Sequence, residues 1–277
     1  MNLPDASLLE TRGLTVTYGG LNANDSIDIA VAHGKLTGLI GPNGAGKTTF
    51  IDAITGFTAP SSGTILFDGV EINTLPPDVR AHRGLSRTFQ SLELFEDLTV
   101  RDNLLVAAEH PRWYSFLVDI VRPNRKDAGL EEQVAWALDV IGLRAIADKL
   151  PSDLSHGQRK LVGVSRALAA RPKLLLLDEP AAGLDTAESQ VLGSHLRDFL
   201  SRDISVFLID HDMGLVLNVC DYIYVLDFGR IIAEGTPAEV RANPKVISAY
   251  LGDSAGEEQA REGSAIGQLD HGSKETA

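Results

Sequence analysis

Cysteine is nearly absent from this chain, whose 277 residues contain only Cys220. A single cysteine cannot form an intrachain disulfide, which predicts folding on an apolar core in a reducing compartment. Long apolar runs are missing too. The longest candidate, at 113–121, is far shorter than the roughly 20 residues that a membrane-spanning helix needs, and it contains Asp119. We therefore expect no membrane-spanning helix, so that any role at a membrane has to come through a partner.

Positive charge is scarce. The chain has 25 lysines and arginines against 38 aspartates and glutamates, a formal net charge of −13. A nucleic-acid-binding face usually needs a basic patch, so this balance argues against a nucleic-acid partner. Nucleotide binding stays open, because a phosphate site is built locally from backbone N–H groups and one lysine. Residues 1–10 lack the basic start and apolar stretch of a secretory signal, and we expect none there.

Apolar residues make up 44% of the chain, enough for one large domain or two closely joined subdomains. Hydrophobic periodicity predicts strands at 14–18, 26–31, 36–40, 64–67, 174–177, 205–209 and 222–226. It predicts helices at 47–55, 100–109, 130–141, 158–170, 187–200 and 213–219. The alternation of strands and helices in the second half predicts a parallel sheet covered on both faces.

The composition changes near the C-terminal end of the sequence. Residues 253–277 are rich in Gly, Ser, Ala and Glu and lack hydrophobic periodicity, which is typical of a flexible acidic tail. We therefore expect the folded domain at 1–252. Its middle, at about 91–170, is predicted to be a helical subdomain, within which 110–127 shows no clear pattern.

One loop matches the G-x-x-x-x-G-K-[ST] phosphate-binding pattern in full, between a predicted strand and a predicted helix. Its glycines let the backbone wrap around phosphates with N–H groups pointing inward. Lys47 is expected to reach the β and γ phosphates, and the Thr48 hydroxyl to complete a magnesium shell. A chance glycine-rich turn is the alternative, which the strand and helix on either side disfavour. The predicted phosphate-binding residues are Gly41, Pro42, Asn43, Gly44, Ala45, Gly46, Lys47, Thr48 and Thr49.

Two carboxylates follow the apolar run at 174–177. Parallel strands deliver catalytic groups at their C-terminal ends, where Asp178 and Glu179 would lie. We expect Asp178 to hold magnesium, directly or through water, and Glu179 to act as the general base on the attacking water. A solvated acidic turn is the alternative. Together with the phosphate loop, the pair predicts a P-loop ATPase.

The segment Leu-Ser-His-Gly-Gln at 154–158 resembles the signature motif of ATP-binding cassette (ABC) ATPases, usually Leu-Ser-Gly-Gly-Gln. The resemblance covers about residues 9–252. It implies an α/β fold: a P-loop NTPase (RecA-like) core with an antiparallel β subdomain and an α-helical signature subdomain. It also implies that Tyr18 stacks on adenine, that Gln90 joins Thr48 and Asp178 at the magnesium site, and that His211 lies beside the γ phosphate. Each of these residues alone has an ordinary structural explanation; their order and spacing carry the resemblance.

The resemblance further implies a dimer. A serine and a glycine at the start of a helix form a second anion site. In ABC ATPases two chains pair head to tail, so that each ATP lies between the phosphate loop of one chain and the signature of the other. The residues implied to contact the partner's ATP are Ser155, His156, Gly157, Gln158 and Asp185. His156 replaces the family's commonest glycine, and we expect it to be tolerated.

Shorter motifs narrow the resemblance to the branched-chain amino acid uptake cassettes: Arg-Thr-Phe-Gln at 87–90, Ala-Ala-Gly-Leu at 181–184, His-Asp-Met at 211–213, and the ending at 243–252. This implies an ATP-hydrolysing importer subunit at the cytoplasmic face of a membrane. Its implied partners are a second cassette, in a homo- or heterodimer, two permease subunits and, indirectly, a substrate-binding protein.

Alternatives remain. A cassette of a urea or amide importer, or of a lipopolysaccharide exporter, shares parts of these motifs. A soluble ABC ATPase of translation or DNA repair would carry two cassettes or a long coiled coil, and neither is evident here. A regulatory cassette that binds ATP without hydrolysis is opposed by Glu179 and His211.

In ABC transporters the permease inserts a short helix beside the glutamine at 90, so the apolar segment that follows is of interest. We expect Phe95 to be an exposed anchor for the permease and Leu98 to pack inside the helical subdomain. Glu93 and Glu96 are expected to pair with basic permease residues.

Overall fold

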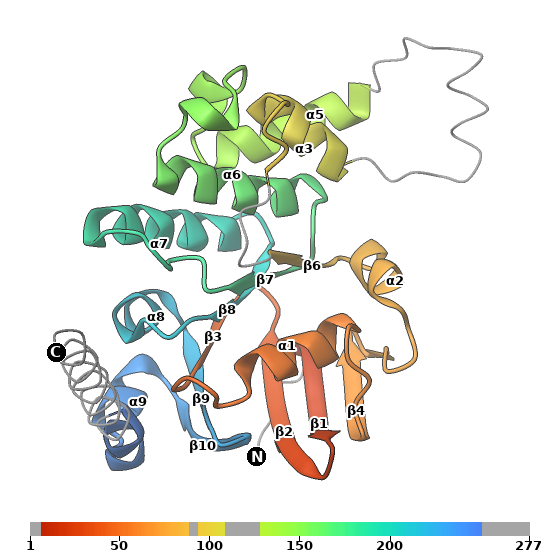
Figure 1. Cartoon of the computed structure of the whole chain (residues 1–277), viewed down its shortest axis with the longest axis vertical. Coiled ribbons are helices and arrows are strands. Elements are labelled where there is room, and N and C mark those ends of the chain that lie inside the picture. Colours follow the sequence, from red (N-terminus) through yellow and green to blue (C-terminus); the bar gives the residue numbers. More distant parts are fainter. Residues whose placement is uncertain (1–6, 89–93, 109–127, 251–277) are drawn as a thin grey trace, which may run out of the picture.

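The computed structural model describes residues 7–88, 94–108 and 128–250. These residues form two sheets and a separate group of helices (Figure 1). One sheet has four strands in the order β2-β1-β4-β5, and the other has six in the order β10-β9-β3-β8-β7-β6. The predicted tail at 253–277 and residue Gln90 lie outside the described residues, so neither prediction is tested.

The four-stranded sheet is antiparallel. It consists of β1 (Ser7–Tyr18), β2 (Leu21–Ala32), β4 (Ser62–Phe67) and β5 (Val70–Glu71). Leu14 and Val16 are buried on one face, as their alternation with polar neighbours predicts. Asp68 and Gly69 both have positive φ, which is the geometry of a type I′ hairpin turn. This sheet is the expected antiparallel β subdomain.

The six-stranded sheet is parallel except at one edge. Its strands are β3 (Leu36–Ile40), β6 (Leu85–Thr88), β7 (Leu174–Asp178), β8 (Ser205–Ile209), β9 (Tyr222–Asp227) and the antiparallel β10 (Arg230–Gly235). Every residue of β3, β7 and β8 is buried, which explains their continuous apolar sequences. Because these strands are parallel, their C-terminal ends deliver the phosphate loop, the acid pair and Asp210–His211 to one edge.

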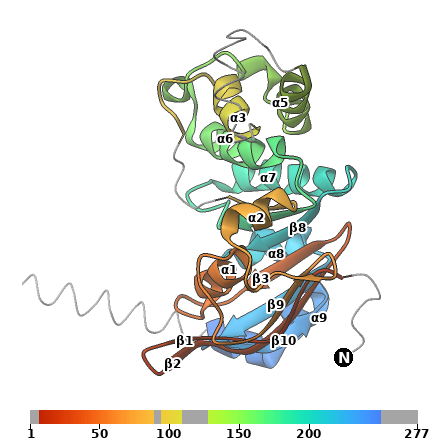
Figure 2. The same ribbon diagram turned by 90° about the vertical axis from the view of Figure 1, so that its right-hand side faces the viewer.

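The helices of the described residues are α1 (Lys47–Thr55), α2 (Pro77–His82), α3 (Val100–Ala108), α5 (Ala128–Val140), α6 (His156–Ala169), α7 (Thr186–Leu200), α8 (Met213–Val219) and α9 (Pro237–Ala242), with short 3-10 turns at Arg144–Ile146 and Pro151–Asp153. Helices α3, α5 and α6 contact one another and form a layer at the far end from β1 and β2 (Figure 2). This layer corresponds to the predicted helical subdomain, whose limits at 91–170 stay a prediction.

The core lies on both faces of the six-stranded sheet. Leu174 and Leu176 of β7 belong to a cluster shared with α1 and the antiparallel sheet. Leu175 and Leu177 belong to a second cluster, shared with α7, α8 and the helical layer. Cys220 is buried, and burial raises the pKa of its thiol. Among the described residues, no helix combines the length and apolar character needed to cross a membrane.

Candidate nucleotide site

The phosphate loop at 41–46 joins β3 to α1 and is pressed against neighbouring backbone on one side. A Cβ atom at Gly41 would lie 2.1 Å from the Leu226 carbonyl oxygen, and one at Gly46 would lie 2.4 Å from that of Ala23. Gly46 also has φ +104, a conformation that favours glycine. Gly44, in contrast, faces open space, since a Cβ there would meet no atom within 4 Å. The loop therefore has a packed side and an open side.

The N-terminus of α1 suits an anion. Its N-cap, Gly46, offers no side-chain hydrogen bond, whereas α6 and α7 each begin with a complete capping box. The first-turn N–H groups of α1 are thus left for a ligand to bind, and the helix dipole adds positive potential there. Thr48 is exposed and Thr49 half-buried at this end of the helix, while Pro42 and Ala45 are buried and Asn43 is exposed. This is the arrangement expected for binding ATP phosphates.

Lys47 lies within the loop itself. Its side-chain Nζ donates to the carbonyl oxygens of Gly41 at 2.6 Å and Pro42 at 3.0 Å, and the residue is only 7% exposed. The positive charge is therefore held at the centre of the loop by the carbonyl groups of the loop.

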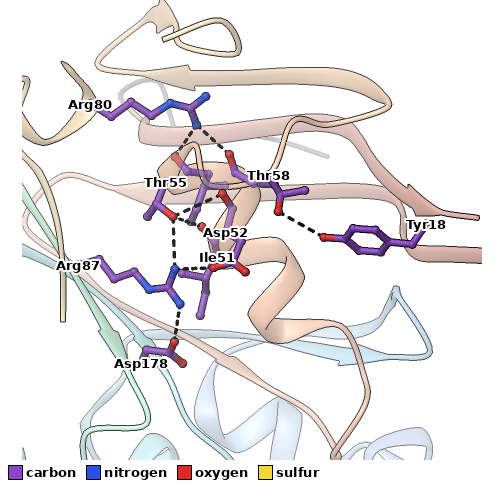
Figure 3. Close-up of polar contacts among 10 residues, drawn as sticks. Tyr18, Ile51, Asp52, Thr55, Thr58, Arg80, Arg87 and Asp178 are labelled. Carbon is purple, nitrogen blue, oxygen red and sulfur yellow. Dashed lines mark hydrogen bonds and ion pairs between the residues drawn. The ribbon is translucent and has the colours of Figure 1, made fainter. Parts of the chain in front are cut away.

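Asp178 ends β7 and is held by an arginine that the sequence showed only as part of a motif. The Arg87 guanidinium donates to Asp178 Oδ2 at 2.9 Å and to Asp52 Oδ1 at 2.6 Å (Figure 3). Burial raises the pKa of Asp178, and the hydrogen bond and positive charge of Arg87 oppose that rise. The carboxylate is therefore positioned by a partner on β6.

Glu179 adopts a left-handed backbone conformation with φ +47. Such a conformation is strained for a residue with a Cβ and costs on the order of 1 kcal/mol. The Glu179 N–H donates to the Ile209 carbonyl at 2.8 Å, which fixes the turn against the end of β8. The left-handed conformation changes the direction of the backbone, and with it that of the Glu179 side chain, as the chain leaves β7. Strained conformations of this kind are concentrated at functional sites.

His211 is brought next to Glu179. Its Nδ1 lies 3.5 Å from Glu179 Oε1 and 3.5 Å from Asp210 Oδ1. Asp210 is fully buried and accepts hydrogen bonds from the backbone N–H groups of Asp212 and Ala181. Burial raises the pKa of Asp210. The structure thus unites the predicted base with the predicted switch histidine, and adds a buried carboxylate that the sequence pattern did not single out.

A buried lysine was also missed. Lys160 of α6 is 9% exposed; burial lowers its pKa, and the charges of Asp210 and Glu179 act in the opposite direction. This places a helical-layer ammonium within electrostatic range of the acidic residues at the sheet edge. The sequence carries no signal for it, because a lysine after the signature motif is indistinguishable from a surface residue.

The signature residues lie at the start of α6. Ser155 Oγ accepts from the Gln158 N–H at 3.2 Å, and Gln158 Oε1 accepts from the Ser155 N–H at 3.1 Å. Ser155 and His156 are exposed, Gly157 is buried and Gln158 half-buried. Figure 1 places this end of α6 in the helical layer, away from α1. Within one chain the signature and the phosphate loop are therefore not brought together, as a head-to-tail dimer requires.

His156 and Gly157 pack on the loop that leads to Asp185. The His156 Nε2 lies 3.1 Å from where a Cβ of Gly183 would be, and a Cβ at Gly157 would lie 2.4 Å from Glu188 Oε1. Exposed Asp185 caps α7 through a reciprocal pair with Glu188. The imidazole of His156 therefore rests on the neighbouring loop of its own chain, which is compatible with its tolerance in the signature.

Tyr18 ends β1, and its ring is half exposed near the phosphate-loop helix. The residue is 52% exposed, and its hydroxyl is 3.3 Å from Thr58 Oγ1 (Figure 3). An exposed ring whose hydroxyl is held by a hydrogen bond suits stacking on a base, which stays a prediction.

The donor set also fits magnesium. Mg²⁺ prefers hard oxygen ligands and is usually held by one or two carboxylates together with substrate phosphates. Thr48 and Asp178 provide a hydroxyl and a carboxylate of that kind. Within 7–88, 94–108 and 128–250, no group of three or more His, Cys, Asp or Glu residues could cage a metal ion. Thr48 and Asp178, together with phosphate oxygens, match the ligand preference of Mg²⁺.

Comparison with known families matches two family models to the chain. One, described as ABC transporter, covers residues 24–182 and so includes the phosphate loop, the signature and the acid pair. The other, described as branched-chain amino acid ATP-binding cassette transporter, covers residues 230–256.

Individual relatives agree with these families. The high-affinity branched-chain amino acid transport ATP-binding protein BraF of Pseudomonas aeruginosa is 39% identical over 251 residues, 89% of this chain and 98% of the relative. LivG of Escherichia coli, named in the same way, is 38% identical over 252 residues, with the same coverage.

Solved structures agree as well. A nucleotide-free ATP-binding cassette from an ABC transporter has a TM-score of 0.78 and 32% identity, covering 88% of this chain and 98% of that chain. A cassette in its ADP conformation has a TM-score of 0.79 and 32% identity, covering 89% and 99%. The chain therefore belongs to the ABC transporter family of ATP-binding ATPases, among the branched-chain amino acid transport cassettes.

Proposed function

We propose that this chain is the ATP-hydrolysing subunit of an importer for branched-chain amino acids, docked on the cytoplasmic face of a membrane. The observation that carries the ATPase chemistry is the sheet edge, where the phosphate loop, Asp178, Glu179 and His211 meet. The amino acid cargo is supported by the family match at 230–256 and by the names of the relatives.

The site residues would share the work as follows. The phosphate loop and Lys47 bind the phosphates of ATP, and Tyr18 stacks on the base. Thr48 and Asp178 hold Mg²⁺ with the phosphates, together with Gln90, which lies outside the described residues; the ion neutralises phosphate charge. Glu179 accepts a proton from the attacking water, and His211 stands beside it to contact the γ phosphate.

Transport by the assembled system tests the cargo. The chain would be expressed with the permease genes next to its own in a strain lacking branched-chain uptake, and leucine, isoleucine and valine uptake measured. ATP-dependent uptake that disappears with Glu179→Gln is expected. Uptake of urea or an amide instead, with no amino acid uptake, would assign the cassette to the alternative importers.

We propose further that two cassettes pair head to tail, and Ser155 offers a test. Ser155→Arg places a large charge at the exposed start of α6, so hydrolysis is expected to fall at least about 100-fold while one chain alone still binds ATP. Nucleotide titration of the isolated chain and phosphate release are the measurements. Ser155→Ala is the comparison variant: it adds no charge or bulk and loses the helix cap, worth about 1 kcal/mol, together with the hydroxyl proposed to contact the partner's ATP, so its hydrolysis is expected to fall less than that of Ser155→Arg. If the isolated Ser155→Arg chain no longer bound ATP, the arrangement in which Ser155 serves the partner's nucleotide would be contradicted.

Docking to the permeases is proposed at Phe95. The residue is 46% exposed, and its backbone N–H and carbonyl both hydrogen-bond the buried Asn103 side chain. The Arg166 guanidinium lies 5.2 Å from the ring centroid. A fixed, exposed aromatic of this kind suits an interface anchor. Glu96, expected to face the permease, pairs with Arg159 in the same chain, and Glu93 lies outside the described residues.

Phe95→Asp is expected to leave ATP binding and melting temperature near wild type. It should weaken co-purification with the permeases at least about tenfold and abolish transport-stimulated hydrolysis, because a desolvated anchor is lost. Val106→Asp is the matched control, since Val106 is also 46% exposed and lies in the same helical layer. If the Phe95→Asp protein assembled with the permeases and supported transport at wild-type levels, Phe95 would not be part of the docking surface.

A further inference from the structure

Arg87 links two elements that the proposed function assigns to the metal site. Its side chain is 9% exposed and bridges Asp52 of α1 and Asp178 of β7, at 2.6 and 2.9 Å (Figure 3). One planar guanidinium can hold two carboxylates at once in a fixed geometry. Arg87 thereby links α1 directly to the end of β7 through two ion pairs.

Asp52 lies one helical turn beyond Thr48. Residues four apart share a face of a helix, so the Thr48 hydroxyl and the Asp52 carboxylate lie along the same side of α1. Asp178 Oδ2 is occupied by Arg87, while no hydrogen bond or ion pair within the described residues involves Asp178 Oδ1. The bridge thus lies one turn below the place where Thr48 and Asp178 would meet a metal ion.

Arg87 lies on β6, and β6 pairs directly with β7. Arg87 pairs with Leu176 and Thr88 with Leu177 in the parallel ladder, and Thr88 Oγ1 is within 3.5 Å of both the Leu176 carbonyl and the Asp178 N–H. Arg87 therefore starts from a rigid position beside Asp178 and reaches across to α1.

Arg80 shows what a purely structural arginine looks like in the same region. It is 2% exposed and donates to the carbonyls of Ala53 and Ile54 at the end of α1 (Figure 3). It also donates to the carbonyls of Leu75 and Asn73. Its partners are backbone groups that finish a helix. Arg87 instead donates to two carboxylates, one of them the proposed metal ligand, and more weakly to the Thr55 hydroxyl at 3.5 Å.

We propose that Arg87 is a positioning residue of the metal site, which fixes the Asp178 carboxylate relative to Thr48 through Asp52 before nucleotide and Mg²⁺ bind. The proposal rests on the proposed function, in which Thr48 and Asp178 hold the ion. A guanidinium next to the site repels a cation by charge alone. The two effects of removing Arg87 therefore change the affinity for Mg²⁺ in opposite directions. Loss of a repelling charge strengthens Mg²⁺ binding, whereas loss of the alignment of Asp178 weakens it.

The experiment measures the ATP dissociation constant of the full chain with excess Mg²⁺ and with EDTA, and takes the ratio of the two. In the wild type, Mg²⁺ is expected to lower the ATP dissociation constant relative to EDTA, and Arg87→Met should reduce this gain in ATP affinity by about tenfold. A loss of about this size is usual when a residue that orients a metal ligand is removed. Affinity in EDTA should change by less than about threefold. Asp52→Asn, which breaks one arm of the bridge, should give a smaller loss, and Arg87→Lys a partial recovery.

Two controls make the outcomes distinct. Arg80→Met is expected to lower the melting temperature and to leave the ratio unchanged. Asp178→Asn tests the metal assignment itself: if it leaves the ratio at the wild-type value, the proposed magnesium site is wrong. If Asp178→Asn lowers the ratio but Arg87→Met and Asp52→Asn both leave it unchanged or raise it, Arg87 does not position the site. Should Arg87→Met fail to fold, Arg87→Lys decides, because it keeps the positive charge and loses the two-armed guanidinium: a wild-type ratio in Arg87→Lys would then show that Arg87 does not position the site.

Discussion

Replacing Glu179 with glutamine is expected to lower steady-state ATP hydrolysis by about 10²–10⁴-fold, the contribution of a positioned general base. This corresponds to about 3–5 kcal/mol of activation free energy. Glutamine keeps the size of the side chain and its capacity for hydrogen bonding, and it meets the same backbone strain at φ +47. It cannot accept the proton of the attacking water. ATP binding should therefore stay near wild type, and a nucleotide-bound dimer should accumulate.

Phosphate release and size-exclusion chromatography in ATP with Mg²⁺ measure the two effects of Glu179→Gln. The control is Glu71→Gln, the same chemical change on an exposed strand of the antiparallel sheet, which should hydrolyse ATP at the wild-type rate. Turnover by Glu179→Gln within about threefold of wild type would remove Glu179 from the role of base, since a catalytic base contributes far more than that. His211, 3.5 Å away, would then be the next candidate.

The elements that were predicted correctly are those whose sequence pattern is produced by a single structural requirement, such as burial on both faces of a strand or a glycine at the end of a helix. The runs at 174–177 and 205–209, apolar except for Ser205, are strands because both of their faces are covered. The helix Lys47–Thr55 was predicted with its ends, since Gly46 and Gly56, both with positive φ, bound it. The strand predicted at 64–67 lies within β4, and the turn that follows it has positive φ at both Asp68 and Gly69.

Several elements were missed, among them β6, β10, α2 and α9, and each of these four lacks a pattern of its own. Strand β6 has the sequence Leu-Ser-Arg-Thr, with one buried residue, and is a strand because it pairs with β7. Strand β10 is an antiparallel addition at the sheet edge. Helices α2 and α9 have six residues each, too few for a hydrophobic period to show, although both have proline in the first turn.

The site was predicted as a set of residues but not as a network. Spacing in the sequence identified the phosphate loop and the acid pair, because their chemistry demands fixed neighbours. Arg87 is separated from Asp52 by 35 positions and from Asp178 by 91, so only the fold reveals the bridge. The contact of His156 with Gly183 is of the same kind. Side-chain partners that come from different strands and helices leave no periodic trace in one sequence.

Lys47→Ala is expected to weaken ATP binding by about 10–100-fold, because a charge-assisted hydrogen bond to the phosphates contributes about 1.5–3 kcal/mol. Hydrolysis at saturating ATP should fall further, by about 10²–10³-fold, since the ammonium also stabilises charge that develops on the γ phosphate. Both losses should survive in Lys47→Met, which keeps the length of the side chain and removes only the charge and the donors.

Lys47 also holds the loop in place. Its Nζ donates to the carbonyl oxygens of Gly41 and Pro42, so both variants remove these contacts together with the phosphate contact, and Lys47→Met keeps only the packing of the side-chain stem. Isothermal titration with ATP, melting curves and phosphate release separate the two effects: a collapsed loop lowers the melting temperature, whereas a lost phosphate contact does not. Lys35→Ala, an exposed lysine just before β3, controls for general loss of positive charge. Unchanged ATP affinity in Lys47→Ala and Lys47→Met would show that the ammonium does not reach the phosphates, and the assignment of residues 41–48 as the nucleotide-binding loop would have to be given up.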